Sequence, residues 1–188
     1  MILLSILICS LESRKEFLAR LQARLAPQLT DEVQVIVNID NRQKSIGQKR
    51  NELLDQACGL YISYVDDDDL VSEDYVSKVL GAIKKSYPDV IGMHLIMTTD
   101  SVITEKTFHS LKYTHWYDEP DPDKPWLKQY YRNPNHLNPV KLDYALAVRF
   151  PLISMGEDKS YSERLKPYLH TEEYIDEPIY FYEFISRK

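Results

Sequence analysis

Four consecutive aspartates, Asp66–Asp69, are the residues whose type and spacing point most clearly to chemistry. Adjacent carboxylates repel one another, and holding them at the end of a buried strand costs free energy unless a cation offsets their charge. Mg²⁺ and Mn²⁺ prefer oxygen ligands and commonly use one or two carboxylates together with substrate phosphate. Because residues two apart in an extended chain point the same way, Asp66 and Asp68 can face one site. The alternative is an acidic turn in which Asp69 caps the following helix.

A second acidic pair, Glu157 and Asp158, follows Gly156 much later in the chain. A carboxylate beside a metal and a phosphate can act as a general base that takes a proton from an acceptor hydroxyl. The same three residues are also an ordinary helix start, because acidic side chains are favourable in a first helical turn. The pair therefore indicates catalysis only in combination with the first acidic run.

Composition excludes several classes of ligand-binding protein. The 188 residues include 29 acidic and 23 basic ones, for a net charge of −6, which disfavours an indiscriminate nucleic-acid binder without excluding a local basic patch. The five glycines are isolated, so neither a Rossmann dinucleotide fingerprint nor a P-loop can be written. A basic cluster precedes the acidic run, which suits an anionic ligand carried with a metal, although two solvated loops are the alternative: Arg42, Lys44, Lys49 and Arg50.

Strands and helices must alternate to position these residues through about the first 96 positions. Apolar and β-branched runs predict strands at 2–9, 33–39, 60–65 and 90–96, and helical spacing predicts helices at 17–25, 46–57 and from about 75 to Pro88. This alternation predicts a mostly parallel sheet with helices on both faces. Such sheets bind ligands at the carboxyl ends of their strands, so Ser10, Asp40 and Asp66 are expected at one edge.

The pattern changes after residue 96. Residues 102–113 predict a pair of strands, and the proline-punctuated segment 118–125 predicts a loop. Helices are expected at 140–148 and from 156 to about 165, and a strand at 174–184. The second part of the chain is therefore expected to be smaller and mixed in its strand directions.

Cysteine usage and the apolar N-terminus bear on the compartment. Cys9 and Cys58 provide no disulfide framework, and their apolar neighbours predict buried thiols in a reducing compartment. Residues 1–11 lack a basic leader and a small-residue cleavage site, and the segment is too short to span a bilayer. A buried first strand explains the segment better, so we expect a cytoplasmic protein without a transmembrane segment.

The order of these features resembles one known family. Residues 45–70 read SIGQKRNELLDQACGLYISYVDDDDL, which resembles the G-x-x-R-N…D-x-D-D stretch of family 2 glycosyltransferases with the GT-A fold. Glu157 and Asp158 fall where that family carries its E-D motif. Further segments resemble the family's first βα unit, second strand and closing aromatic strand: Leu3–Leu25, Val35–Asn41 and Ile179–Tyr182.

The resemblance implies an α/β fold of GT-A type, with a Rossmann-like, mostly parallel sheet and helices on both faces. It implies one domain over 1–188, in which 1–96 binds the nucleotide and 97–188 supplies the acceptor side and the catalytic base. The activity implied is metal-dependent, inverting transfer of one sugar from a nucleoside-diphosphate sugar to a hydroxyl acceptor, which we expect to be a glycan. The alternatives are a nucleotide-sugar-binding module without turnover and a transferase that acts on modified DNA bases.

The resemblance also implies roles for individual residues. Asp158 would be the catalytic base, with Glu157 beside it. Asp66 and Asp68 would hold Mn²⁺ or Mg²⁺, with Asp68 as the direct ligand and Asp66 also near the ribose. Three residues would contact the nucleotide sugar in addition to Asp66: Asp40 at the base, Arg50 near the nucleotide pocket, and Asp67.

Two features are left open by the resemblance. The family often follows its closing tyrosine with an arginine and a nearby histidine, whereas Glu183 and Phe184 stand here. A third metal or phosphate contact is therefore unassigned, and its candidates are His109, His136 and His170. The aromatic stretch 116–131, with His136, is expected either to pack within the fold or to contact the acceptor.

Overall fold

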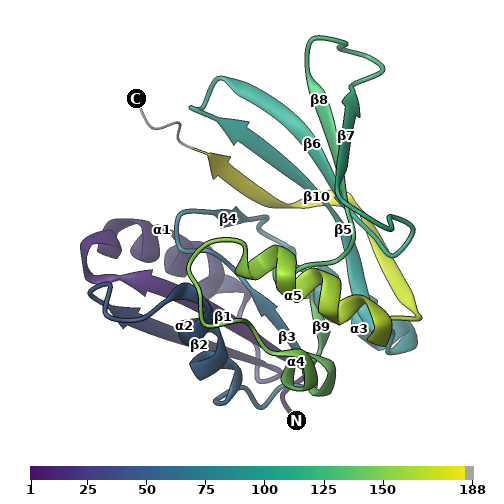
Figure 1. The fold of residues 1–188 in the computed structure, drawn as a ribbon. Coiled ribbons are helices and arrows are strands. Elements are labelled where there is room, and N and C mark those ends of the chain that lie inside the picture. Colours follow the sequence, from purple (N-terminus) through teal and green to yellow (C-terminus); the bar gives the residue numbers. More distant parts are fainter. Residues whose placement is uncertain (185–188) are drawn as a thin grey trace.

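The apolar run at the N-terminus forms a central strand of the sheet. In the computed structural model, which describes residues 1–184, β1 (Leu4–Leu11) is buried at all but its last residue. It pairs in parallel with β2 (Val33–Asp40) on one side and with β3 (Tyr61–Tyr64) on the other (Figure 1). A strand with both edges paired and both faces covered has no solvent-facing side chains, which explains the continuous apolar run.

The described residues form one ten-stranded sheet with the order β2-β1-β3-β9-β5-β6-β8-β7. β10 pairs in parallel with β5 and antiparallel with the short β4, off this path. The remaining strands span β4 (Leu70–Val71), β5 (Val90–Thr99), β6 (Ile103–His109), β7 (Tyr117–Pro120), β8 (Lys128–Arg132), β9 (Val140–Lys141) and β10 (Glu172–Phe184). The N-terminal strands are parallel and the later ones mixed, which confirms the predicted fold class.

Helices cover both faces of the sheet. The helices are α1 (Lys15–Leu25), α2 (Ile46–Leu54), α3 (Tyr75–Ser86), α4 (Leu142–Val148) and α5 (Glu157–Leu165), with short 3₁₀ turns at Glu12–Arg14, Ala26–Gln28 and Lys166–Tyr168. Alternate β1 side chains enter two hydrophobic clusters: Ile6 packs with buried residues of α1 and α3, and Leu7 packs with those of α2, α4 and α5. This period of two assigns α1 and α3 to one face and the other three helices to the opposite face.

Several predicted elements differ from the structure. The predicted strand pair at 102–113 is one strand, β6, whose antiparallel partner is the end of β5. β7 begins just before the predicted loop 118–125 and extends into it, and the sequence indicates no strand where β8 lies. The helix predicted to begin at 140 is preceded by β9, and α2 ends at Leu54 rather than 57. The edge strand β7 and its neighbour β8 depend on pairing with other segments of the sheet, so local pattern indicates them poorly.

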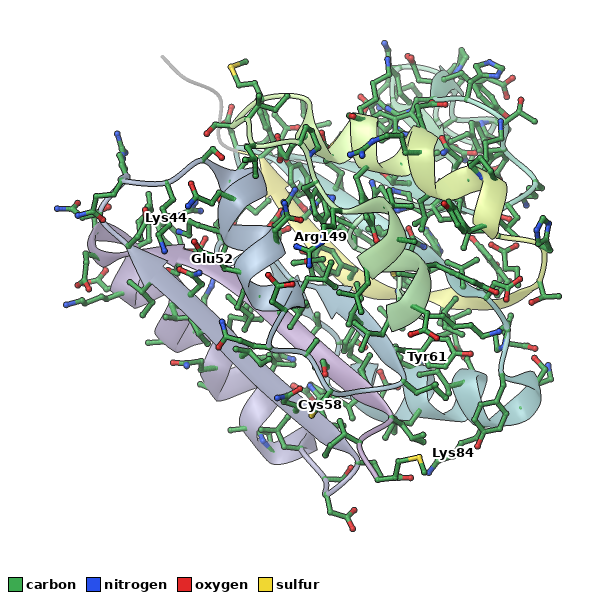
Figure 2. All side chains as sticks on the ribbon, turned by 60° about the horizontal axis from the view of Figure 1, so that its bottom comes forward. Lys44, Glu52, Cys58, Tyr61, Lys84 and Arg149 are labelled. Carbon is green, nitrogen blue, oxygen red and sulfur yellow. The ribbon has the colours of Figure 1, made fainter. Side chains whose placement is uncertain are left out.

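Two predictions about single residues are also wrong. Asp69 does not cap α3, because β4 intervenes and Asp74 occupies the N-cap position. Cys58 is exposed rather than buried, because α2 ends early and the residue lies in the following loop (Figure 2). Cys9 is buried as predicted, and both cysteines are free thiols. Within residues 1–184, no helix combines the length and hydropathy needed to cross a bilayer.

Candidate active site

The carboxyl ends of three parallel strands bring the predicted residues to one edge of the sheet. Lys49, on α2, donates to the backbone oxygen of Ser10 and to Asp40 Oδ1, the latter at 2.6 Å. The Ser10 hydroxyl in turn donates to Asp67 Oδ2 at 2.5 Å. The expectation that Ser10, Asp40 and the acidic run share this edge is therefore confirmed.

The four aspartates divide into two buried and two accessible carboxylates. Asp67 is 1% exposed and also pairs with Arg14 at 3.0 Å. Asp69 is fully buried and accepts a hydrogen bond from the Tyr180 hydroxyl at 2.7 Å. Burial, together with the nearby charge of Asp66, raises the pKa of Asp69 above its ordinary value. The side chains of Asp66 and Asp68 remain 29% and 38% exposed, so the two residues spaced for one site are the ones that a ligand can reach.

The two accessible carboxylates have different partners. Asp68 forms an ion pair with Arg14, and its backbone oxygen accepts a hydrogen bond from Arg20 at 2.6 Å. Asp66 accepts from Arg50 at 3.2 Å and lies 3.4 Å from His136 Nε2. Burial favours the neutral form of Asp66, but Arg50 and His136 outweigh it and hold the pKa of Asp66 below its ordinary value. Asp66 is therefore a carboxylate anion at neutral pH.

Arg50 links the two acidic clusters. Its side chain is buried, and its guanidinium pairs with Glu157 Oε1 at 2.8 Å as well as with Asp66. The same guanidinium lies 5.3 Å from the centre of the Phe150 ring and 5.8 Å from that of Tyr64. The structure thus places Arg50 between the D-x-D run and the E-D pair, with one carboxylate on each side.

The E-D pair begins α5, and its two carboxylates have different surroundings. Gly156 precedes the helix with a φ of 76°, a left-handed conformation that glycine adopts readily. Glu157 is buried against Arg50, whereas Asp158 is partly exposed and accepts from the backbone N–H of Lys159 at 2.7 Å. Among the described residues, Asp158 forms no ion pair, so its carboxylate is available to a ligand.

Two cavities lie over this edge of the sheet. One, of about 510 Å³ and called the larger cavity below, brings together Arg50, Asp66, His136, Glu157 and Asp158 with residues of the second half of the chain. The other, of about 300 Å³, contains Asp40 and basic or neighbouring residues: Arg14, Arg42, Lys44 and Lys49. Ser154 lines both, so the cavities adjoin. Their contiguity suits a ligand that extends from the end of β2 to the E-D pair.

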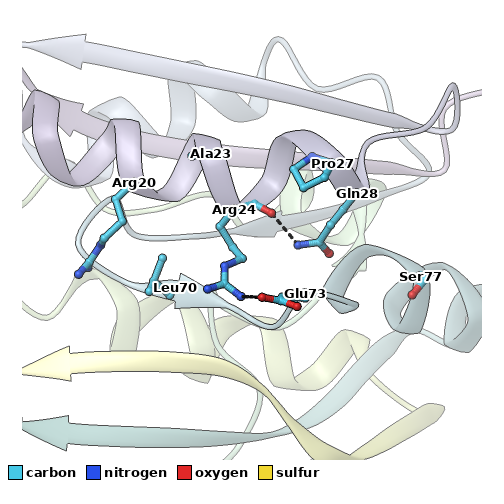
Figure 3. A pocket seen from close by; sticks show the side chains of 8 residues that line it. All are labelled: Arg20, Ala23, Arg24, Pro27, Gln28, Leu70, Glu73 and Ser77. Atoms are coloured by element: carbon cyan, nitrogen blue, oxygen red, sulfur yellow. Dashed lines mark hydrogen bonds and ion pairs between the residues drawn. The ribbon is translucent and has the colours of Figure 1, made fainter.

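Two predicted residues lie outside these cavities. Asp67 lines neither of them, and Asp68 lines a small cleft of about 180 Å³ with Arg20 and Tyr182. A larger groove of about 850 Å³ runs between α1 and the β4–α3 segment, where Arg24 pairs with Glu73 (Figure 3). That groove contains none of the predicted site residues, so its size does not indicate the site of chemistry.

The three candidate histidines differ in their position relative to Asp66 and the larger cavity. His136 lines the larger cavity beside Asp66, and its Nδ1 has no hydrogen-bond partner in the described part of the chain. His109 lines the same cavity but is buried against Asn138, and burial lowers its pKa to about 3. His170 is exposed and lies away from the cavity, where its backbone N–H donates to Asp89. His136 is therefore the histidine placed to assist Asp66.

Asn51, which sequence reasoning left unassigned, fastens the loop that leads to the E-D pair. Its amide group donates to the Phe150 backbone oxygen and accepts from the Phe150 backbone N–H, both at 2.9 Å. Gly47 reinforces this attachment, since its N–H donates to the Ile153 oxygen at 3.1 Å. Both residues belong to the G-x-x-R-N motif, which was the available signal. The motif therefore holds the loop 150–156 against α2.

We expect Gly47→Ala to displace this loop. A Cβ at position 47 would lie 1.9 Å from the Pro151 backbone oxygen, so the backbone itself must move. Such overpacking typically costs about 1–3 kcal/mol of unfolding free energy. Chemical denaturation measures this loss, and Gly81→Ala is the matched control, because nothing lies within 4 Å of a Cβ there. Equal stability of the two variants would contradict the proposed close packing.

The donor set tests whether a metal fits. No group of three or more His, Cys, Asp or Glu side chains among residues 1–184 is arranged to hold a metal ion. Mg²⁺ and Mn²⁺ that bind together with substrate phosphates need only one or two carboxylates, however. Asp66 and Asp68 are accessible and line two cavities that share Tyr182, so their number and donor chemistry meet that smaller requirement.

Comparisons with known proteins agree with this geometry. S. aureus TarS superposes with a TM-score of 0.71 at 14% identity, over 97% of this chain and 37% of TarS. TarS 1–349 in complex with UDP has a TM-score of 0.72 at 13% identity, over 97% of this chain and 60% of that one. The complex with UDP-GlcNAc has a TM-score of 0.68 at 12% identity, over 100% of this chain and 59% of that one. The chain thus spans about 37–60% of these proteins, and they share its GT-A fold.

Family membership rests on the sequence itself. A search of curated proteins returned no match. The sequence profile described as glycosyl transferase family 2, in contrast, matches residues 5–162, which include both acidic clusters and the G-x-x-R-N motif. The chain belongs to glycosyl transferase family 2.

Proposed function

We propose that this chain transfers one sugar from a UDP-sugar to a hydroxyl group of an acceptor, with inversion at the anomeric carbon. The observation that carries the proposal is the position of Asp158, which lines the same cavity as Asp66 and has no ion pair among the described residues. A general base must be accessible and unneutralised to accept the proton of an attacking hydroxyl. Direct attack by that hydroxyl in one displacement inverts the anomeric centre.

The proposed donor site extends over the smaller cavity beside Asp40. The two Asp40 oxygens accept from Lys49 and from the backbone N–H groups of Gln43 and Lys44. A carboxylate has about four acceptor positions, so one remains for the N–H of a nucleotide base. TarS was crystallised with UDP and with UDP-GlcNAc, which makes UDP-GlcNAc the first donor to test on this chain.

Asp66 and Asp68 are the proposed ligands of Mn²⁺ or Mg²⁺ at the donor diphosphate. Such a cation, when bound, stabilises the negative charge that grows on the departing UDP. Arg14 forms an ion pair with Asp68 Oδ2 in the structure, which leaves Oδ1 of this carboxylate as the oxygen for the cation. Asp66 is kept ionised by Arg50, which suits either a metal ligand or a ribose contact.

Glu157 has a different proposed role from Asp158. Its carboxylate is buried and pairs with Arg50, so it cannot readily reach a substrate hydroxyl. It instead fixes the first turn of α5 against α2 and thereby sets the position of the neighbouring Asp158. We therefore assign proton transfer to Asp158 and positioning to Glu157.

The proposal is tested by UDP release from UDP-GlcNAc in the presence of Mn²⁺, measured over a panel of saccharide acceptors. We expect acceptor-dependent release that chelation of the metal abolishes. Saturable binding of UDP without release on any acceptor would instead support a binding module without turnover.

We expect Asp68→Asn to weaken Mn²⁺ binding in the presence of UDP and to lower transfer by about 100-fold, because a neutral amide is a poorer ligand for a divalent cation. Calorimetric titration of Mn²⁺ into the protein with UDP measures the binding effect independently of turnover. Glu73→Gln is a control of equal charge change, since Glu73 is exposed and lies in the separate groove. Unchanged Mn²⁺ affinity in Asp68→Asn would contradict the metal assignment.

A further inference from the structure

One wall of the larger cavity is built from the later strands of the sheet. β6 pairs in parallel with β8, so that Thr107 lies opposite Tyr130 and His109 opposite Arg132. All four line the cavity, because residues two apart along a strand share a face. The intervening Phe108 and Tyr131 stack on each other instead, with ring centres 5.5 Å apart. The aromatic stretch thus contributes to packing on one face and to the cavity on the other.

Arg132 is held on this wall between two aromatic rings. Its guanidinium carbon lies 5.2 Å from the ring centre of Trp116 and 5.2 Å from that of Tyr130, and all three residues line the cavity. Its Nη1 donates to the backbone oxygens of Tyr117 and Tyr131 at 2.7 and 3.0 Å. These contacts fix the orientation of the guanidinium group without neutralising its charge.

The charge of Arg132 has no carboxylate partner among the described residues. Burial lowers the pKa of Arg132, and the nearby Asp118, whose charge opposes this shift, forms its ion pair with Lys128 at 2.7 Å. Arg50, the other arginine of the cavity, in contrast forms ion pairs with two carboxylates, those of Asp66 and Glu157. A half-buried guanidinium pays a desolvation cost that an anion would offset. The cavity therefore contains one oriented cation that its own carboxylates leave unpaired.

A second unpaired group lies beside Arg132. The indole Nε1 of Trp116 is covered and has no hydrogen-bond partner within residues 1–184. Because that atom is covered, a ligand in the cavity contacts the indole ring rather than its N–H. Arg132 therefore supplies the charge of this wall and Trp116 an aromatic surface beside it.

We infer that the acceptor substrate carries an anionic group, a carboxylate or a phosphate, that Arg132 binds between Trp116 and Tyr130. The inference rests on the proposed function, since it takes the larger cavity as the acceptor site. The donor diphosphate is assigned to Asp66 and Asp68 with their cation. Asp66 also lines this cavity, so the donor reaches its edge, whereas Arg132 lies on the wall that β6 and β8 form. Arg132 belongs to the second half and does not line the cavity that contains Asp40. A guanidinium group binds both carboxylate and phosphate through paired N–H donors.

The inference is tested by binding, which requires no turnover. Calorimetric titrations compare methyl β-D-glucoside with methyl β-D-glucuronide and with methyl β-D-glucoside 6-phosphate, in the presence of UDP and Mn²⁺. We expect at least one anionic probe to bind about tenfold or more tightly than the neutral one, as charge-assisted hydrogen bonds provide. The preferred probe then distinguishes a carboxylate-bearing from a phosphate-bearing acceptor.

Arg132→Gln is expected to remove this preference and to leave the affinity for UDP unchanged, while Arg132→Lys retains part of it. Lys106→Gln is the matched control, because Lys106 lies on β6, pairs with Asp121 at 3.4 Å and does not line the cavity. Thermal unfolding verifies that the variants are folded. The inference is overturned if neither anionic probe is preferred or if Arg132→Gln keeps the preference. It is also overturned if Arg132→Gln weakens the binding of UDP instead. Failure of the wild type to bind UDP or to release it from UDP-GlcNAc would contradict the proposed function separately.

Discussion

Asp158→Asn is expected to lower the kcat of sugar transfer by about 10²–10⁴-fold, the contribution typical of a general base. The amide is nearly the same size as the carboxylate but cannot accept the proton of an attacking hydroxyl. The Asp158 carboxylate has a backbone N–H as its partner and no ion pair among the described residues, so its replacement disturbs few contacts. We therefore expect the affinity for UDP and the unfolding free energy to remain close to those of the wild type.

The measurement combines steady-state transfer from UDP-GlcNAc with calorimetric titration of UDP. Glu163→Gln is the matched control, because Glu163 is an exposed acid on the same helix, α5, and does not line the cavity. This control is expected to keep full activity. Retention of wild-type kcat by Asp158→Asn would rule out Asp158 as the base.

Arg50→Met is expected to have the largest effect on stability, a loss of about 3–5 kcal/mol of unfolding free energy. The buried guanidinium pairs with both Asp66 and Glu157, and methionine would leave both carboxylates without their cation. Burial disfavours a charged arginine, but the carboxylates around it prevail and raise the pKa of Arg50, so its positive charge is retained in the fold. Sugar transfer is expected to fall as well, because α5 loses its attachment to α2.

Urea unfolding measures the loss, and two further variants identify its cause. Arg24→Met removes an arginine whose partner Glu73 is exposed, and surface ion pairs contribute about 1 kcal/mol or less. Adding Glu157→Gln to Arg50→Met removes one of the two carboxylate charges left without a cation, so the double variant should recover part of the lost unfolding free energy. An Arg50→Met variant no less stable than Arg24→Met would show that the ion pairs do not hold the two clusters together.

Local pattern determined the first half of the fold and the chemical nature of the site. The continuous apolar run of β1 and the helical spacing in α1 and α3 indicate their elements without knowledge of neighbours, because burial sets each period along the chain. Once strand and helix alternate, parallel pairing follows, and it brings Ser10, Asp40 and Asp66 to one edge. The acidic run and the E-D pair were also visible as residue types at given positions.

The second half of the sheet depended on pairing between distant segments. β8 follows β6 in parallel register, and the short β7 is held by β8, so neither strand has a strong pattern of its own. The division of the aromatic stretch between packing and cavity follows from this register. Only the register places Tyr130 and Arg132 on the cavity side and Tyr131 on the other, and Trp116 reaches the cavity from the residue just before β7.

The tertiary structure also determined which side chain pairs with each carboxylate of the site. The spacing of the four aspartates predicted only that Asp66 and Asp68 can face one site, whereas the fold buries Asp67 and Asp69 and leaves Asp66 and Asp68 accessible. The reason is long-range contact: Tyr180 on β10 reaches Asp69, and Arg50 on α2 reaches both Asp66 and Glu157. The sequence by itself determined which carboxylates are present and at which edge they gather. The tertiary structure decided which of them are neutralised, because burial and distant cations, rather than chain neighbours, set the state of each carboxylate.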